Sequence, residues 1–87
     1  MRILIINLLR LIEIGKISGL NKNDLNYAID FLNHNEFGLC FDTIITQMYE
    51  YDLEIDSDAY NLICNIGESM NLEIESYFFM KDSVIEK

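Results

Sequence analysis

The sequence feature that most restricts the fold of this 87-residue chain is its lack of proline. The chain also has only four glycines. Sandwiches and barrels of many short strands need frequent turn residues, so this composition disfavours them and favours helices. Hydrophobic residues make up 51% of the chain and charged residues 24%, which is typical of a globular protein. The length fits a single domain over residues 1–87 with one modest core.

Apolar residues recur at helical spacing along most of the chain. A first helix is expected from about Ile3 to Lys16, with Asn7, Arg10 and Glu13 forming one narrow polar stripe. A helix this apolar is usually buried by neighbours on more than one side, so we expect it inside the bundle.

Three further amphipathic stretches follow. We expect a second helix after a cap at Asn21 or Asn23, a third near Glu36 to Tyr51, and a fourth after Asp56 or Ser57. Their expected inward residues are Leu25, Ala28, Ile29 and Leu32; Phe37, Cys40, Phe41, Ile44, Ile45 and Met48; and Ala59, Leu62, Ile63, Ile66 and Met70. A final helix is expected to turn Tyr77, Phe78, Val84 and Ile85 inward. The sequence thus predicts an all-α fold, a compact bundle of about five short helices.

Charge is distributed unevenly along the chain. The net charge is −9, and residues 23–80 hold twelve acids with no Lys or Arg, whereas residues 1–22 hold four bases and one acid. This balance argues against direct binding to nucleic acid or to an anionic membrane, and it favours a basic protein partner.

The apolar N-terminus is not expected to direct export. Arg10 and Glu13 interrupt the apolar run, and no small-x-small cleavage site follows it. The run is also far shorter than the ~20 residues that span a bilayer. We therefore expect a cytoplasmic protein in which Cys40 and Cys64 are reduced thiols.

The chain carries no motif for catalysis or for a cofactor. It lacks a glycine-rich nucleotide loop and a paired-histidine zinc helix, and its one histidine, His34, is expected to be a solvated residue at a helix end. Cys40 and Cys64 are 24 residues apart, which is no zinc pattern. A calcium loop starting at Asp52 would have Ile63 in place of the closing glutamate. We expect no enzymatic activity, no metal and no cofactor.

An acidic and aromatic segment is the candidate interaction site. Its residues are Tyr49, Glu50, Tyr51, Asp52, Glu54, Asp56, Asp58 and Tyr60. Over residues 52–56 the pattern alternates, so the acids are expected on one side of an extended segment and Leu53 and Ile55 on the other. Clustered carboxylates speed association with a basic protein, and tyrosines often dominate binding energy. The alternative, a solvated loop with its tyrosines packed inward, stays open.

Two segments of the chain carry a resemblance to a known family. They are HNEFGLCFD at residues 34–42 and QMYEYD at residues 47–52. They resemble the MafI-like immunity proteins of polymorphic and contact-dependent growth inhibition toxin systems, and the likeness extends over roughly residues 24–85. It implies a small helical, non-catalytic protein of the cytoplasm that binds and neutralises the toxin domain of its own system, commonly a nuclease with a basic cleft. Gly38 in the motif is expected to allow a close helix approach.

The sequence therefore predicts an immunity protein whose partner is a cognate toxin C-terminal domain. One alternative is an acidic nucleic-acid mimic or regulatory subunit that binds a host DNA- or RNA-binding protein. Another is a subunit that buries its first helix in a weak homodimer. Salt-sensitive recognition of a single toxin distinguishes the first from the others.

Overall fold

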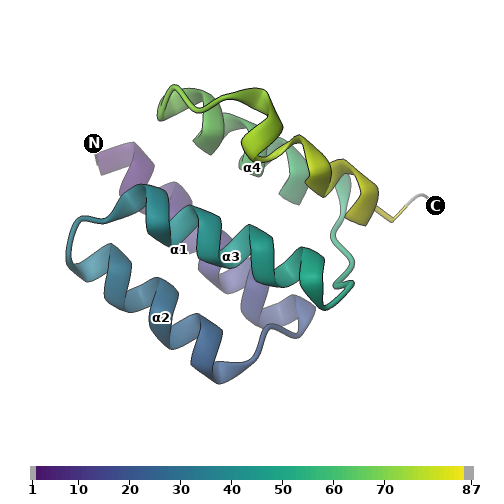
Figure 1. Ribbon diagram of the computed structural model, residues 1–87, viewed down its shortest axis with the longest axis horizontal. Coiled ribbons are helices and arrows are strands. Elements are labelled where there is room, and N and C mark those ends of the chain that lie inside the picture. Colours follow the sequence, from purple (N-terminus) through teal and green to yellow (C-terminus); the bar gives the residue numbers. More distant parts are fainter. Residues whose placement is uncertain (1, 86–87) are drawn as a thin grey trace.

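Residues 2–85 form four α-helices and two short 3₁₀ helices joined by short connections (Figure 1). The computed structural model describes residues 2–85. Its elements are α1 (Arg2–Ser18), α2 (Lys22–Asn33), α3 (Phe37–Glu50), α4 (Ser57–Ser69), η1 (Ile74–Ser76) and η2 (Phe78–Ser83). The predicted all-α bundle is confirmed. None of the helices within residues 2–85 combines the length and the apolar character needed to cross a membrane.

Side-chain caps begin two of the helices. The Asn21 carboxamide oxygen accepts a hydrogen bond from the Asp24 N–H at 2.9 Å and starts α2. The Asp56 carboxylate accepts from the Ala59 N–H at 2.8 Å and starts α4. Each cap satisfies one of the N–H groups that have no partner inside the helix. Of the two cap residues expected for each helix, the observed cap is the first: Asn21 and not Asn23 for α2, and Asp56 and not Ser57 for α4.

Each α-helix is followed, one or two positions after its last residue, by a residue with positive φ, which explains how a chain without proline stops its helices. These residues are Gly19, Asn35, Asp52 and Asn71. The next residue in each case donates its N–H to the carbonyl five residues earlier, at 2.8–3.0 Å; the donors are Leu20, Glu36, Leu53 and Leu72. This left-handed ending uses helix carbonyls that would otherwise lack a partner, and glycine, asparagine and aspartate tolerate it best.

The core forms where the helices face one another. α1 packs against α2, α3 and α4, and α2 lies alongside α3 (Figure 1). The buried apolar residues are Leu8, Leu11, Ile12, Leu20, Ala28, Leu32, Cys40, Phe41, Ile44, Ile45, Met48, Ile55, Ala59, Ile63, Ile66, Tyr77 and Met80. The inward faces predicted for residues 36–51 and 57–70 are largely confirmed, although Leu62 and Met70 are half-buried and Ile29 on α2 is exposed.

The outer face of α1 differs from the prediction. Ile3, Ile6, Leu9 and Ile17 are exposed, so the helix is not buried on all its apolar sides. Its three neighbours cover only the face that carries Leu8, Leu11 and Ile12. In a bundle of four α-helices, no element remains to cover the opposite face.

The last segment also differs from the predicted helix. It forms η1 and η2, and Tyr77 and Met80 point inward while Phe78 is exposed. A 3₁₀ helix repeats every three residues, so Tyr77 and Met80 face the same side. Val84 is extended and forms an isolated parallel bridge with Ile55, which prevents the helix from continuing.

Close helix approach occurs at Gly67 and not at Gly38. Gly38 is exposed, and a Cβ placed there would meet no atom within 4 Å, so the expectation from the motif is wrong. Gly67 on α4 is buried against the Tyr77 ring, and a Cβ there would lie 2.8 Å from Cζ and closer still to Cδ2 and Cε2. Glycine at 67 is what lets the last segment fold back onto α4.

One acid lies inside the bundle. Asp24 is buried, and the Gln47 Nε2 amide donates to its two carboxylate oxygens at 3.2 Å each. The pair joins α2 to α3. The sequence alone does not indicate that Asp24 is buried, because its partner Gln47 lies 23 residues away.

Cys40 is expected to resist thiol reagents while the protein is folded. It is fully buried, and burial raises the pKa of its thiol to about 11. At pH 7 only about one such thiol in ten thousand is a thiolate. Cys64 is half-buried, so a thiol-reactive dye should label it first and Cys40 only in denaturant, as read by peptide mass spectrometry. A Cys64→Ser control should label only on unfolding; rapid labelling of Cys40 in that control would contradict its burial.

Candidate protein-binding surface

The eight residues of the candidate site lie at the junction between α3 and α4. Tyr49 and Glu50 end α3, and Tyr51 and Asp52 form the turn that follows. Glu54 lies in the extended segment, Asp56 caps α4, and Asp58 and Tyr60 belong to its first turns. All five acids are exposed.

The extended segment at residues 53–56 positions the acids. Ile55 is buried and Leu53 half-buried, while Glu54 and Asp56 are exposed, so the predicted alternation is confirmed. The Ile55 N–H donates to the Ser83 carbonyl at 3.0 Å, and the Ile85 N–H donates to the Ile55 carbonyl at 2.8 Å. These two bonds fix the segment against the end of the chain.

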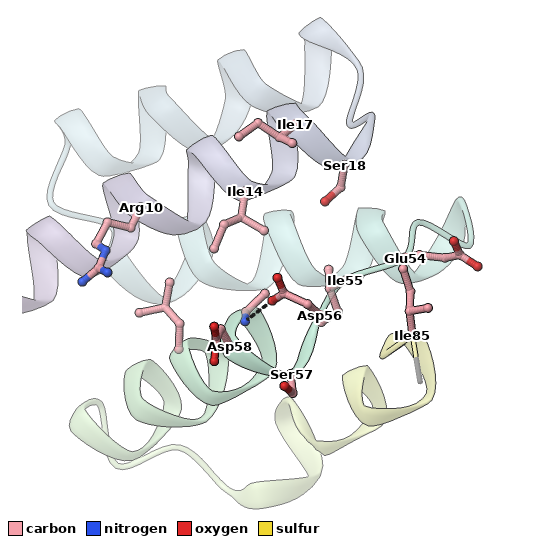
Figure 2. A pocket seen from close by; sticks show the side chains of 12 residues that line it. Arg10, Ile14, Ile17, Ser18, Glu54, Ile55, Asp56, Ser57, Asp58 and Ile85 are labelled. Atoms are coloured by element: carbon pink, nitrogen blue, oxygen red, sulfur yellow. Dashed lines mark hydrogen bonds between the residues drawn. The ribbon is translucent and has the colours of Figure 1, made fainter. Parts of the chain in front are cut away.

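A groove with a cavity volume of about 830 Å³ lies between α1 and the start of α4 (Figure 2). We call it the α1–α4 groove. Its lining residues are Arg10, Ile14, Ile17, Ser18, Glu54, Ile55, Asp56, Ser57, Asp58, Ala59, Leu62 and Ile85. Half of these residues are apolar. Three carboxylates line the α4 side, and Arg10 is the one base on the α1 side.

Other residues of the site line a second, smaller hollow of about 340 Å³. Its lining residues are Tyr49, Asp52, Leu53, Glu54, Asp82, Ser83, Val84 and Ile85. Glu54 and Ile85 line both concavities. Of the eight candidate residues, Asp56 and Asp58 line only the groove, and Tyr49 and Asp52 line only the smaller hollow. The other three, Glu50, Tyr51 and Tyr60, line neither.

The three tyrosines have different environments. Tyr49 is 42% exposed and packs edge-on against Phe79, with ring centroids 5.1 Å apart. Tyr51 is 52% exposed, and its hydroxyl accepts from the Asn21 amide at 3.4 Å. Tyr60 is half-buried, and desolvation together with neighbouring Cys64 raises its pKa to about 12. Two tyrosines are thus accessible to a partner, and the third packs inward.

Among the residues that the structure describes, no Lys or Arg lies within 4.0 Å of the acids at residues 50–58. The single acid–base pair closer than 4.0 Å in this part of the chain is His34 Nδ1 with Asp30 Oδ1, at 3.8 Å. His34 itself is exposed at the C-terminal end of α2, as predicted. Repulsion among the unpaired acids is not offset inside the molecule, and a basic partner would relieve it.

The three comparisons with known proteins are negative. The chain matches no protein-family model, no curated protein and no solved structure. What indicates a function for this chain is therefore the chemistry and geometry of its surface.

Asp56 has a structural role as well as a charge, and the two can be separated. Asp56→Ala removes the cap of α4 and is expected to lower the free energy of unfolding by about 1 kcal/mol. Asp56→Asn keeps an oxygen acceptor without the charge and should cost much less. Urea unfolding followed by circular dichroism measures both. Equal losses in the two variants would contradict the cap as the source of the effect.

Several groove residues could not be expected from the sequence. Ile14, Ile17 and Ser18 reach the site only because α1 lies beside α4, and Ile85 only because Val84 pairs with Ile55. The one local signal is Ile17, which extends an apolar surface past the predicted end of the first helix.

Proposed function

We propose that this protein is an immunity protein that binds and neutralises the cognate toxin domain of a contact-dependent growth inhibition or related polymorphic toxin system. The observation that carries the proposal is the set of exposed, unpaired carboxylates at residues 50–58, beside accessible Tyr49 and Tyr51. The resemblance of residues 34–42 and 47–52 to MafI-like immunity proteins supports it as well. It acts in the cytoplasm and catalyses no reaction.

A nuclease-type toxin suits this surface because a cleft that binds a phosphate backbone is basic. Carboxylates held on a folded surface compete with phosphates for the same Lys and Arg side chains. The protein can neutralise the toxin by entering that cleft or by covering a surface beside it. A tight complex buries roughly 1,200–2,000 Å² in total, so the interface extends beyond the acidic residues onto a helix face.

Calorimetry with the toxin domain encoded immediately upstream tests the proposal. We expect nanomolar or tighter binding at about 0.01 M salt that weakens at about 0.15 M, because the Debye length falls from about 30 Å to about 8 Å. The protein should also abolish the toxin's activity at equimolar ratio. An absence of binding at both salt concentrations would overturn the proposal for that toxin.

The same titration separates an immunity protein from a general nucleic-acid mimic. Unrelated basic nucleases and DNA-binding proteins serve as matched partners at the same two salt concentrations. An immunity protein should bind its own toxin at least about a thousandfold more tightly than these, a difference of roughly 4 kcal/mol. Similar affinity for several of them would indicate the mimic.

A further inference from the structure

The extended segment in the α1–α4 groove has one edge on which three backbone groups make no backbone hydrogen bond within residues 2–85, while the fourth, the Asp56 carbonyl, accepts from the Tyr60 N–H at 3.1 Å. Successive residues of an extended chain direct their N–H and C=O groups to opposite edges. Ile55 uses both of its groups on the edge that faces Ser83 and Ile85. The N–H and C=O of Glu54, and the N–H of Asp56, have no backbone partner among residues 2–85. Such an open edge can accept a strand from another chain.

Large apolar side chains in the same groove remain in contact with water. Ile17 is 77% exposed and Ile85 is 41% exposed, and both line the groove with half-buried Ile14 and Leu62. Single exposed apolar residues are common on protein surfaces. These four residues instead share one concave surface, which a ligand with apolar side chains can cover.

The charges of the groove determine which kind of segment fits it. Glu54, Asp56 and Asp58 line one side, with no basic group within 4.0 Å in the part of the chain that the structure describes, and Arg10 supplies the one guanidinium of the lining on the other side (Figure 2). A basic segment is therefore complementary. A second copy of this chain is a poor occupant, because its net charge is −9 and the Lys and Arg residues that the structure describes lie in α1, α2 and η2 and not in an extended segment.

We propose that an extended, basic segment of the partner toxin domain binds in the α1–α4 groove by adding a strand along Glu54–Asp56. Its backbone pairs with the open edge, its apolar side chains cover Ile14, Ile17 and Leu62, and its Lys or Arg side chains meet Glu54 and Asp58. Strand addition gives affinity through main-chain bonds and specificity through alternate side chains. The inference depends on the proposed function for the identity of the partner.

A matched pair of substitutions on α1 tests the groove in the toxin complex. Ile17→Lys removes an apolar contact in the groove and adds a positive charge that repels a basic segment, whereas Ile3→Lys makes the same change at a residue of similar exposure, 73%, on the same helix outside the groove. We expect Ile17→Lys to weaken toxin binding about tenfold or more and Ile3→Lys to change it less than about twofold. Hydrogen exchange adds a signature specific to strand addition, since the Glu54 and Asp56 amides should become protected in the complex.

The outcomes separate this inference from the proposed function. If the toxin domain binds the wild type and Ile17→Lys equally well, or leaves the Glu54 amide unprotected, the groove inference is wrong and the immunity function stands. If the toxin does not bind at all, the groove inference is tested by selecting binders to the protein from a library of short random peptides. Recovery of basic, apolar peptides that protect the Glu54 amide from hydrogen exchange would support the inference, and failure to recover such peptides would overturn it.

Discussion

Replacing Gly67 with alanine is expected to lower the free energy of unfolding by about 1–3 kcal/mol, because the new methyl group overlaps the buried Tyr77 ring. Neither group can move easily. Gly67 is part of α4, and Tyr77 is buried and packs against Phe41, with ring centroids 6.3 Å apart. In a domain this small, each kcal/mol corresponds to a fall of about 4–8 °C in melting temperature.

Gly38→Ala is the matched control for this substitution. Gly38 also lies in an α-helix, but a Cβ there meets nothing within 4 Å. The same chemical change should therefore stabilise the protein by up to about 1 kcal/mol, through the helix propensity of alanine alone. Urea unfolding of both variants gives the comparison. Equal stability of Gly67→Ala and the wild type would show that Tyr77 does not pack on α4.

The sequence correctly predicts those parts of the fold that depend on residues close together in the chain. Apolar spacing identified the buried side of α3, with Cys40, Phe41, Ile44, Ile45 and Met48, because α1, α2 and η2 pack against α3 and bury these residues. Asn21 and Asp56 were each one of the two cap residues expected for their helix. A cap can be predicted locally because its side chain accepts from an N–H only three positions along the chain.

The parts that depend on distant contacts were missed. The final segment is 3₁₀ and then extended because Tyr77 packs on Gly67 and Val84 pairs with Ile55, and neither contact leaves a local signal. The acidic residues of the candidate site were found as a sequence cluster. The contribution of Ile17 to the larger concavity follows from how α1 lies against α4, and the position of Asp52 in the smaller one follows from how residues 82–85 lie beside residues 52–54.

Reversing the two carboxylates of the groove that have no capping role is expected to slow association with the toxin domain about tenfold at low salt. The variant is Glu54→Lys with Asp58→Lys, which leaves the Asp56 cap in place. Electrostatic steering raises association rates by about 10- to 1,000-fold, and these side chains line the concave surface where the field concentrates. Stopped-flow association rates at about 0.01 M and about 0.15 M salt should converge for the variant and the wild type.

Glu73→Lys with Glu75→Lys is the control that separates local complementarity from net charge. Both double variants raise the net charge by the same amount, and Glu73 and Glu75 are exposed near η1, outside both concavities. If steering depends on where the acids are, the control should associate nearly as fast as the wild type. If both variants slow association equally, overall charge attracts the toxin and the groove does not direct it. Unchanged rates in both would mean that the partner docks on another face, with the exposed apolar side of α1 the next surface to mutate.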